Sequence, residues 1–184
     1  IALVLGLSCI VCGADTMNGV LQEIWLDVPG ERVADLTDSP RYAETADRIT
    51  TLRRFETETS ADQYGSRFSA RLVPTKAGTY TFWLASDDGG ELWLSTDDDP
   101  GSLRLIAKVD GYTAKDAWES QAGQQSAPVQ LEAGKGYLIR ALLKEGGGAD
   151  HLSVAWRGPG IEREIIPGEN LRLPEMDDAM RAKV

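Results

Sequence analysis

The sequence predicts an all-β fold, a two-sheet antiparallel β-sandwich with short helical decorations. Short apolar runs separated by turn residues recur from Gly19 onward, and no stretch repeats its apolar residues with the 3.6-residue period of a long helix. About nine such runs at this spacing are typical of a sandwich. The 184 residues are enough for one domain and too few for two full ones.

Each expected strand is an apolar run bounded by turn residues. In chain order the strands are Val20–Leu26, Leu52–Glu56, Ser66–Pro74, Thr79–Ser86, Glu91–Ser95, Leu103–Val109, Ala127–Glu132, Tyr137–Lys144 and Leu152–Trp156. Both faces of Thr79–Ser86 are fairly apolar, which suits an inner strand. Two short helices are expected, at Arg32–Leu36 and Lys115–Glu119.

Charge excludes several classes of partner. The chain carries 19 basic and 29 acidic residues, a formal net charge of −10. Nucleic-acid recognition requires a basic surface, and adhesion to an anionic membrane requires basic residues as well, so neither is expected. With one His and two Cys, the chain offers few residues for a zinc site or for nucleophilic catalysis.

Residues 1–14 are uncharged and almost wholly apolar, and they end in small residues. This pattern predicts the remnant of a secretory signal peptide, cleaved after Ala14. The alternatives are a buried element at the edge of the domain, or a lipoprotein acylated at Cys9. We therefore expect a secreted or cell-envelope protein of bacterial origin, with no membrane insertion after cleavage. The domain then spans 15–173, and 174–184 is a polar tail or the start of a linker to a further domain.

The densest acidic feature is Asp87-Asp88-Gly89-Gly90-Glu91, at an expected turn between two strands. Adjacent carboxylates repel each other unless a cation lies between them, and Ca²⁺ prefers such oxygen ligands. A solvated acidic turn is the alternative. The same choice applies to Asp97-Asp98-Asp99, for which a solvated turn is the simpler interpretation.

A second unusual loop is Lys144-Glu145-Gly146-Gly147-Gly148-Ala149-Asp150-His151. Its three glycines are more than a hairpin turn requires, and they would expose backbone groups to a ligand. A flexible hairpin is the alternative.

Together these loops resemble a known family. Gly78 to Leu94, read GTYTFWLASDDGGELWL, is similar to the signature of the protective-antigen-type (PA-14) domain, and Gly136 to Trp156 resembles the later strand–loop–strand block of that family. Gly19–Trp25 and Ile166-Pro167 also fit, so the resemblance covers roughly residues 19–173.

The resemblance implies a β-sandwich with a calcium-dependent carbohydrate site. In lectin-like members two adjacent Asp, joined by a cis peptide, chelate one Ca²⁺, and a facing loop adds ligands and shapes the sugar pocket. The implied metal ligands here are Asp87, Asp88, Glu145, Gly147 and Asp150. The implied carbohydrate-binding residues are Asp87, Asp88, Gly146, Gly147, Gly148, Asp150, His151 and Trp118. His151 departs from the family, where an Asn is frequent, and a neutral imidazole suits Ca²⁺ poorly.

Five Trp could stack on a sugar ring. Trp25, Trp83, Trp93 and Trp156 lie within apolar strands, which favours packing. Trp118 lies in a polar stretch and is expected either to form an exposed stacking surface or to cover the edge of the core.

The function expected from the sequence is a secreted, non-catalytic carbohydrate-binding module that uses Ca²⁺ and binds glycans or glycoconjugates. No pair of carboxylates stands out as an acid–base couple, so we do not expect an enzyme. The alternatives are a protein-interaction or structural module, and an accessory domain of a larger secreted glycan-active enzyme or adhesin.

Overall fold

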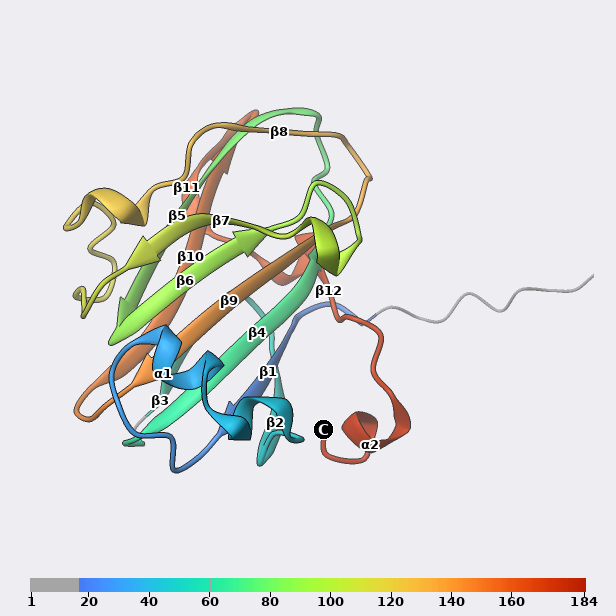
Figure 1. Cartoon of the computed structure of the whole chain (residues 1–184). Helices are drawn as coiled ribbons and strands as arrows, with labels where there is room; N and C mark the ends of the chain where they lie inside the picture. The colour runs from blue at the N-terminus through green and yellow to red at the C-terminus, as the bar shows by residue number, and fades with distance from the viewer. Residues whose placement is uncertain (1–16, 60) are drawn as a thin grey trace, which may run out of the picture.

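The structure is a computed structural model that describes residues 17–59 and 61–184, and it confirms the two-sheet antiparallel sandwich (Figure 1). The first sheet has the order β2 (Arg48–Leu52), β1 (Val20–Trp25), β4 (Tyr64–Leu72), β9 (Tyr137–Glu145), β6 (Gly89–Leu94) and β7 (Arg104–Val109), with β12 (Leu171–Arg172) also paired to β4. The second has the order β11 (Ile161–Ile165), β10 (Asp150–Gly158), β5 (Gly78–Asp87) and β8 (Val129–Leu131), with β3 (Glu56–Thr59) also paired to β10.

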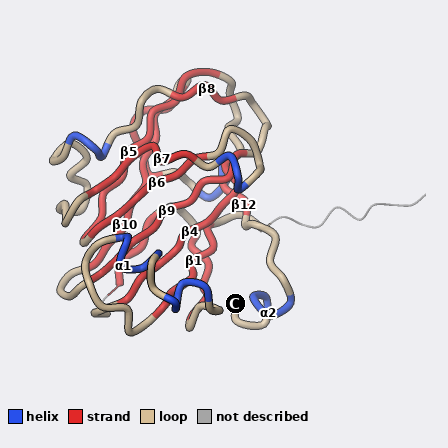
Figure 2. Tube along the Cα trace, viewed as in Figure 1, coloured by secondary structure: helices blue, strands red, loops and turns tan. Residues whose placement is uncertain are grey.

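The helices are short and lie outside the sheets (Figure 2). They are α1 (Val33–Thr37), η1 (Pro40–Ala43), η2 (Pro100–Ser102), η3 (Ala122–Gln124), η4 (Gly168–Asn170) and α2 (Asp178–Arg181). The helix expected at Arg32–Leu36 is α1, shifted by one residue. The helix expected at Lys115–Glu119 is wrong, because this segment forms turns and Asp116 has a φ of 60°, which a right-handed helix cannot accommodate.

The strand expected at Leu52–Glu56 is also wrong. Leu52 ends β2 in the first sheet, and Glu56 begins β3 in the second, so the chain changes sheets between them. Phe55 is fully buried at this crossing, and its N–H donates to the carbonyl of Ile166. Its apolar character therefore reflects burial in the core and not membership of a strand. The other eight expected strands are present with shifted ends.

The main core lies between the sheets and follows the two-residue period of the strands. Tyr80, Phe82 and Leu84 point into it from β5, and Trp156 stacks on Tyr80 with ring centroids 5.2 Å apart. Trp83, on the other face of β5, is also buried, and the guanidinium groups of Arg157 and Arg163 lie over its ring. Of the Trp expected to pack, Trp25, Trp83 and Trp156 are buried, whereas Trp93 is half-buried.

A second apolar cluster lies outside the main core. It contains Leu21, Trp25, Val28, Leu36, Ala46, Ile49 and Leu173. Met176 and Met180 of the C-terminal segment pack against it, and the Lys183 Nζ donates to the carbonyl of Ala46 over 2.7 Å. The segment 174–184, read from sequence as a polar tail or linker, therefore contributes apolar contacts through its methionines.

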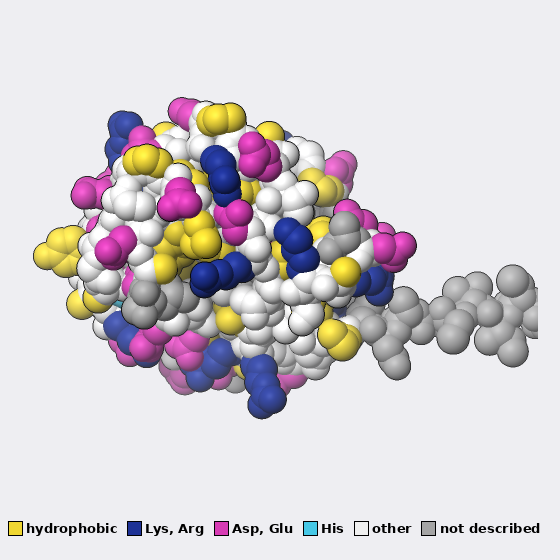
Figure 3. Space-filling view, turned by 90° about the horizontal axis from the view of Figure 1, so that it is seen from below, with side chains coloured by type: hydrophobic (Ala, Val, Ile, Leu, Met, Phe, Trp, Pro, Cys, Tyr) yellow, Lys and Arg dark blue, Asp and Glu magenta, His cyan; other side chains and the backbone are white. Residues whose placement is uncertain are grey.

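Acidic and basic side chains are interspersed on the face seen in Figure 3, with small hydrophobic patches between them. No helix in the described part of the chain is long and apolar enough to cross a bilayer. The predicted signal-peptide remnant, including Cys9, lies outside the described residues.

Candidate functional site

Two connections between the sheets meet at one end of the sandwich. Asp87 ends β5 and lies beside His151 in the second sheet, while Gly89 begins β6 and lies beside Lys144 in the first. Because β5 is antiparallel to β10 and β6 is antiparallel to β9, the β5–β6 and β9–β10 connections lie at the same end of the sandwich. The two loops that the sequence singled out are therefore neighbours.

Three carboxylates converge between these connections. One oxygen each from Asp87, Asp88 and Glu145 lies within 4.8 Å of the other two. The peptide bond between Asp87 and Asp88 is cis, as the family resemblance implies. A hydrogen bond from the Ser86 hydroxyl to the Asp88 carbonyl, 2.9 Å long, holds this turn from within the strand.

Glu145 is the most unusual member of this cluster. Its side chain is fully buried, and neither carboxylate oxygen has a hydrogen-bond partner in the described part of the chain. Burial, followed by the charges of Asp88, Asp150 and Asp87, raises its pKa to about 7. The nearby backbone N–H of Asp88, which lies outside hydrogen-bonding geometry, offsets this rise only in part. A buried carboxylate with no donor is costly unless a cation or a proton neutralises it.

The residues around the cluster share its acidic character. Burial, and then the charge of Asp88, raises the pKa of Asp87. Asp150 is buried beside the cluster, and one of its oxygens accepts from the Ala61 N–H over 3.3 Å. Burial lowers the pKa of His151, so the imidazole is neutral near pH 7. Its Nε2 has no partner within residues 17–59 and 61–184.

The glycine loop is attached to the cluster and to a third loop. The Gly146 N–H donates to Asp88 Oδ2 over 3.0 Å, and the Gly148 N–H donates to Asp62 Oδ1 over 3.2 Å. Gln63 donates to the Gly146 carbonyl through both its backbone N–H and its side-chain amide. Sequence reasoning missed Asp62 and Gln63, because nothing local marks the segment before β4 as part of this site.

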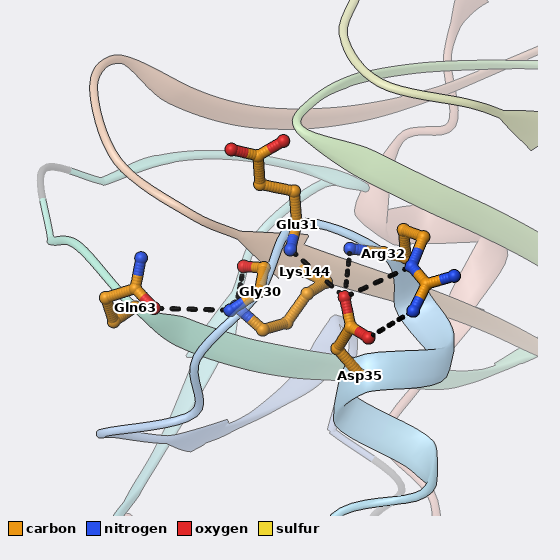
Figure 4. A network of polar contacts seen from close by, with 6 residues as sticks. All are labelled: Gly30, Glu31, Arg32, Asp35, Gln63 and Lys144. Atoms are coloured by element: carbon orange, nitrogen blue, oxygen red, sulfur yellow. Dashed lines mark hydrogen bonds and ion pairs between the residues drawn. The ribbon is translucent and has the colours of Figure 1, made fainter.

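A buried lysine connects the site to the segment between β1 and α1 (Figure 4). Lys144 is fully buried and donates to the carbonyls of Gly30 and Glu145 over 2.6 and 2.5 Å. The Gly30 N–H in turn donates to Gln63 Oε1 over 3.2 Å. Burial lowers the pKa of Lys144, against the opposing effect of Glu145 and other acidic neighbours. The segment before α1 is thus a fourth component of the site.

The structure adds a second aromatic candidate to Trp118. Trp118 is half-buried in turns after β7, where neighbouring Glu119 pairs with Arg163 over 2.7 Å. Tyr112, in the same segment, is 69% exposed. The next residue, Thr113, donates its N–H to the Ser86 carbonyl over 2.8 Å, one residue before Asp87. This hydrogen bond holds the backbone next to Tyr112 close to the acidic turn, and the Tyr112 side chain is exposed.

This donor set fits a hard cation. All the convergent groups are oxygens, and the unpartnered oxygens of Glu145 lie in the cluster. Ca²⁺ takes six to eight oxygen ligands with flexible geometry, whereas zinc prefers nitrogen and sulfur. The second acidic turn is different. Asp97 accepts from the Asp99 N–H and the Ser102 hydroxyl, and Asp98 pairs with Arg71, so local donors already satisfy that turn.

Comparisons with known proteins agree with the resemblance. The sequence model of the PA14 domain family matches residues 28–170. The mouse N-acetyl-beta-glucosaminyl-glycoprotein 4-beta-N-acetylgalactosaminyltransferase 1 is 33% identical over 131 residues, 67% of this chain and 13% of the relative. The anti-sigma-I factor RsgI3 of Acetivibrio thermocellus is 32% identical over 111 residues, 60% of this chain and 15% of the relative. The chain thus spans less than a sixth of either relative.

Solved structures share the fold. The PA14 sugar-binding domain from an RTX adhesin superposes with a TM-score of 0.65 and 16% identity, covering 86% of this chain and 99% of that one. The epithelial adhesin 6 A domain of Candida glabrata, solved with Galb1-3GlcNAc, gives 0.63 and 12% identity, covering 90% and 91%. An anti-sigma factor domain-containing protein from Clostridium clariflavum gives 0.61 and 18% identity, covering 88% and 51%.

Proposed function

The chain belongs to the PA14 domain family, and we propose that it is a calcium-dependent carbohydrate-binding module. The observation that carries the proposal is the convergence of Asp87, Asp88 and Glu145, with both Glu145 oxygens buried and unpartnered within the described residues. Sugar-binding PA14 domains among the structures of the same fold support it.

In this proposal Asp87, Asp88 and Glu145 hold the ion, with Asp150 and the backbone of Gly147 completing the protein ligands. Bound Ca²⁺ would offer its open coordination positions to sugar hydroxyls. Other groups of the chain would position the glycine loop and contact the sugar. Asp88 fixes the glycine loop through Gly146, and this loop can present backbone N–H groups to the sugar with little steric hindrance.

Aromatic surface would add stacking on the sugar ring. Tyr112 is the stronger candidate because it is exposed beside the acidic turn, and Trp118 from the same segment is the second. His151, being neutral and buried beside Asp87, would accept or donate one hydrogen bond and not bind the metal. Such a shallow site binds a single sugar weakly, so useful affinity would come from multivalency.

We further propose that the module is secreted or attached to the cell envelope, is bacterial, and has no catalytic activity of its own. It covers a small part of its curated relatives, which suggests a binding domain within a larger protein. The mouse transferase provides no reason to assign transfer chemistry to this segment alone. The convergent carboxylates are explained by an ion, which leaves no acid–base pair to assign.

A glycan array with and without a chelator tests the proposal. We expect binding to neutral glycans in millimolar calcium, its loss with the chelator, and its loss in Asp87→Asn. Asp98→Asn, a half-exposed aspartate paired with Arg71 beyond the other end of β6, is the matched control and should bind like the wild type. Binding that survives the chelator, or none at all, would favour a structural or protein-interaction module instead.

A further inference from the structure

Glu31 lies at the edge of the proposed site and has an exposed side chain. Its backbone is fixed on both sides, since its N–H donates to Asp35 Oδ2 over 3.2 Å and its carbonyl accepts from the Gly89 N–H over 3.3 Å. In Figure 4 the carboxylate points away from the network that holds the backbone. Across the described ranges it makes no hydrogen bond or ion pair.

The position of this carboxylate is defined by Gly146. A Cβ on Gly146 would lie 3.4 Å from the carboxyl carbon of Glu31 and 3.2 Å from Asp88 Oδ2. The two acidic groups therefore lie on the same side of the glycine loop, and a ligand contacting that loop beside Asp88 meets Glu31 as well. The absence of a side chain at Gly146 is what allows Glu31 to approach so closely.

The negative charge of the site determines which ligands Glu31 favours. Asp87, Asp88, Glu145 and Asp150 carry four negative charges, more than one divalent cation and the buried Lys144 ammonium neutralise together. Glu31 adds a further charge at the rim, and Asp62 adds another behind Gly147. An acidic sugar approaching this rim is repelled, whereas a hydroxyl or a protonated amine can donate to the Glu31 carboxylate.

We propose that Glu31 is a specificity-determining residue that favours neutral sugars and sugars with a free amine, and disfavours uronic and other acidic sugars. The inference rests on the proposed sugar-binding function. It requires no movement of the backbone, because the segment between β1 and α1 is already held by Lys144, Gln63 and Asp35. Exposed charges a few ångströms apart change an equilibrium by about threefold to tenfold, and the effect weakens in high salt.

The test is calorimetric titration of the full chain with matched methyl glycosides of galactose, galactosamine and galacturonic acid, and of their glucose counterparts, in millimolar calcium at low salt. We expect the wild type to bind the amino sugar about threefold to tenfold more tightly than the neutral sugar, and the uronic acid more weakly by a similar factor. Glu31→Gln should bind the neutral sugar within about twofold of the wild type and reduce both differences by about twofold or more, the remainder coming from the other carboxylates of the site. Glu162→Gln, an exposed substitution on β11 beyond the other end of β10, should keep them.

The outcomes separate this inference from the function on which it rests. Calcium-dependent binding of neutral sugars without discrimination by charge, or discrimination of unchanged size in Glu31→Gln, would overturn the role of Glu31 and leave the module's function intact. Failure of the wild type to bind any of these sugars would overturn the proposed function, and the inference with it.

Discussion

Substitution of Glu145 by glutamine tests whether the buried cluster is poised for a cation. In the metal-free chain the pKa of Glu145 is raised from 4.5 to about 7, so the folded state binds this proton more tightly than the unfolded state does. The folded state therefore loses stability as the pH rises from the pKa of Glu145 in the unfolded chain to its pKa in the folded chain. Between pH 5 and pH 8 these two values correspond to about 2.5 kcal/mol of unfolding free energy.

The assay is urea unfolding of metal-stripped wild type and Glu145→Gln at pH 5 and pH 8. From pH 5 to pH 8 the unfolding free energy should fall by about 2–3 kcal/mol more in the wild type than in the variant. Any fixed cost of burying the amide is the same at both pH values and cancels in this comparison. Saturating calcium should stabilise the wild type at pH 8 and not the variant. Glu162→Gln, which removes an exposed carboxylate, should behave like the wild type. Identical pH dependence in wild type and Glu145→Gln would show that Glu145 binds its proton no more tightly in the folded chain than in the unfolded one.

Three further variants test the parts that surround the cluster. Gln63→Gly keeps the left-handed backbone at φ 54° and removes two side-chain hydrogen bonds, so calorimetry should show calcium affinity lower by about threefold to tenfold; unchanged affinity would contradict a positioning role. Lys144→Met leaves the carbonyls of Gly30 and Glu145 without their buried donor and should lower the unfolding free energy by about 2–3 kcal/mol in urea melts; a loss below about 0.5 kcal/mol would show that the contact is dispensable. Tyr112→Ala should weaken sugar binding by about threefold to tenfold with little change in stability, whereas Trp118→Ala should mainly reduce stability; the reverse pattern would assign stacking to Trp118.

The sequence predicted the fold where the pattern was local. Apolar residues on both faces of β5 identified an inner strand, because a strand covered on both sides carries few polar residues. The run around Phe55 was wrongly predicted as a strand for a related reason, since a residue buried at a crossing between sheets is as apolar as a residue in a short buried strand. The methionines of the C-terminal segment were not recognised as apolar contacts because only tertiary packing brings them onto the second cluster.

In the candidate site, too, the sequence predicted the local features and missed those that depend on tertiary packing. The adjacency of Asp87 and Asp88 and the acidic residue before the glycines were visible in the sequence, and family resemblance suggested that they meet. Glu31 and Gln63 were missed, because their role depends on loops that β1, β4 and β9 bring together. No local pattern marks a residue that acts through the carbonyl of Gly146.

Calorimetric titration of calcium into the metal-stripped chain, with the wild type and Asp87→Asn measured side by side, shows whether the acidic cluster binds this ion. We expect one site per chain in the wild type, no measurable binding in the variant, and a sugar titration that gives heat only after calcium is present. Absence of calcium binding by the folded wild type at millimolar concentrations would contradict the proposed calcium-dependent function.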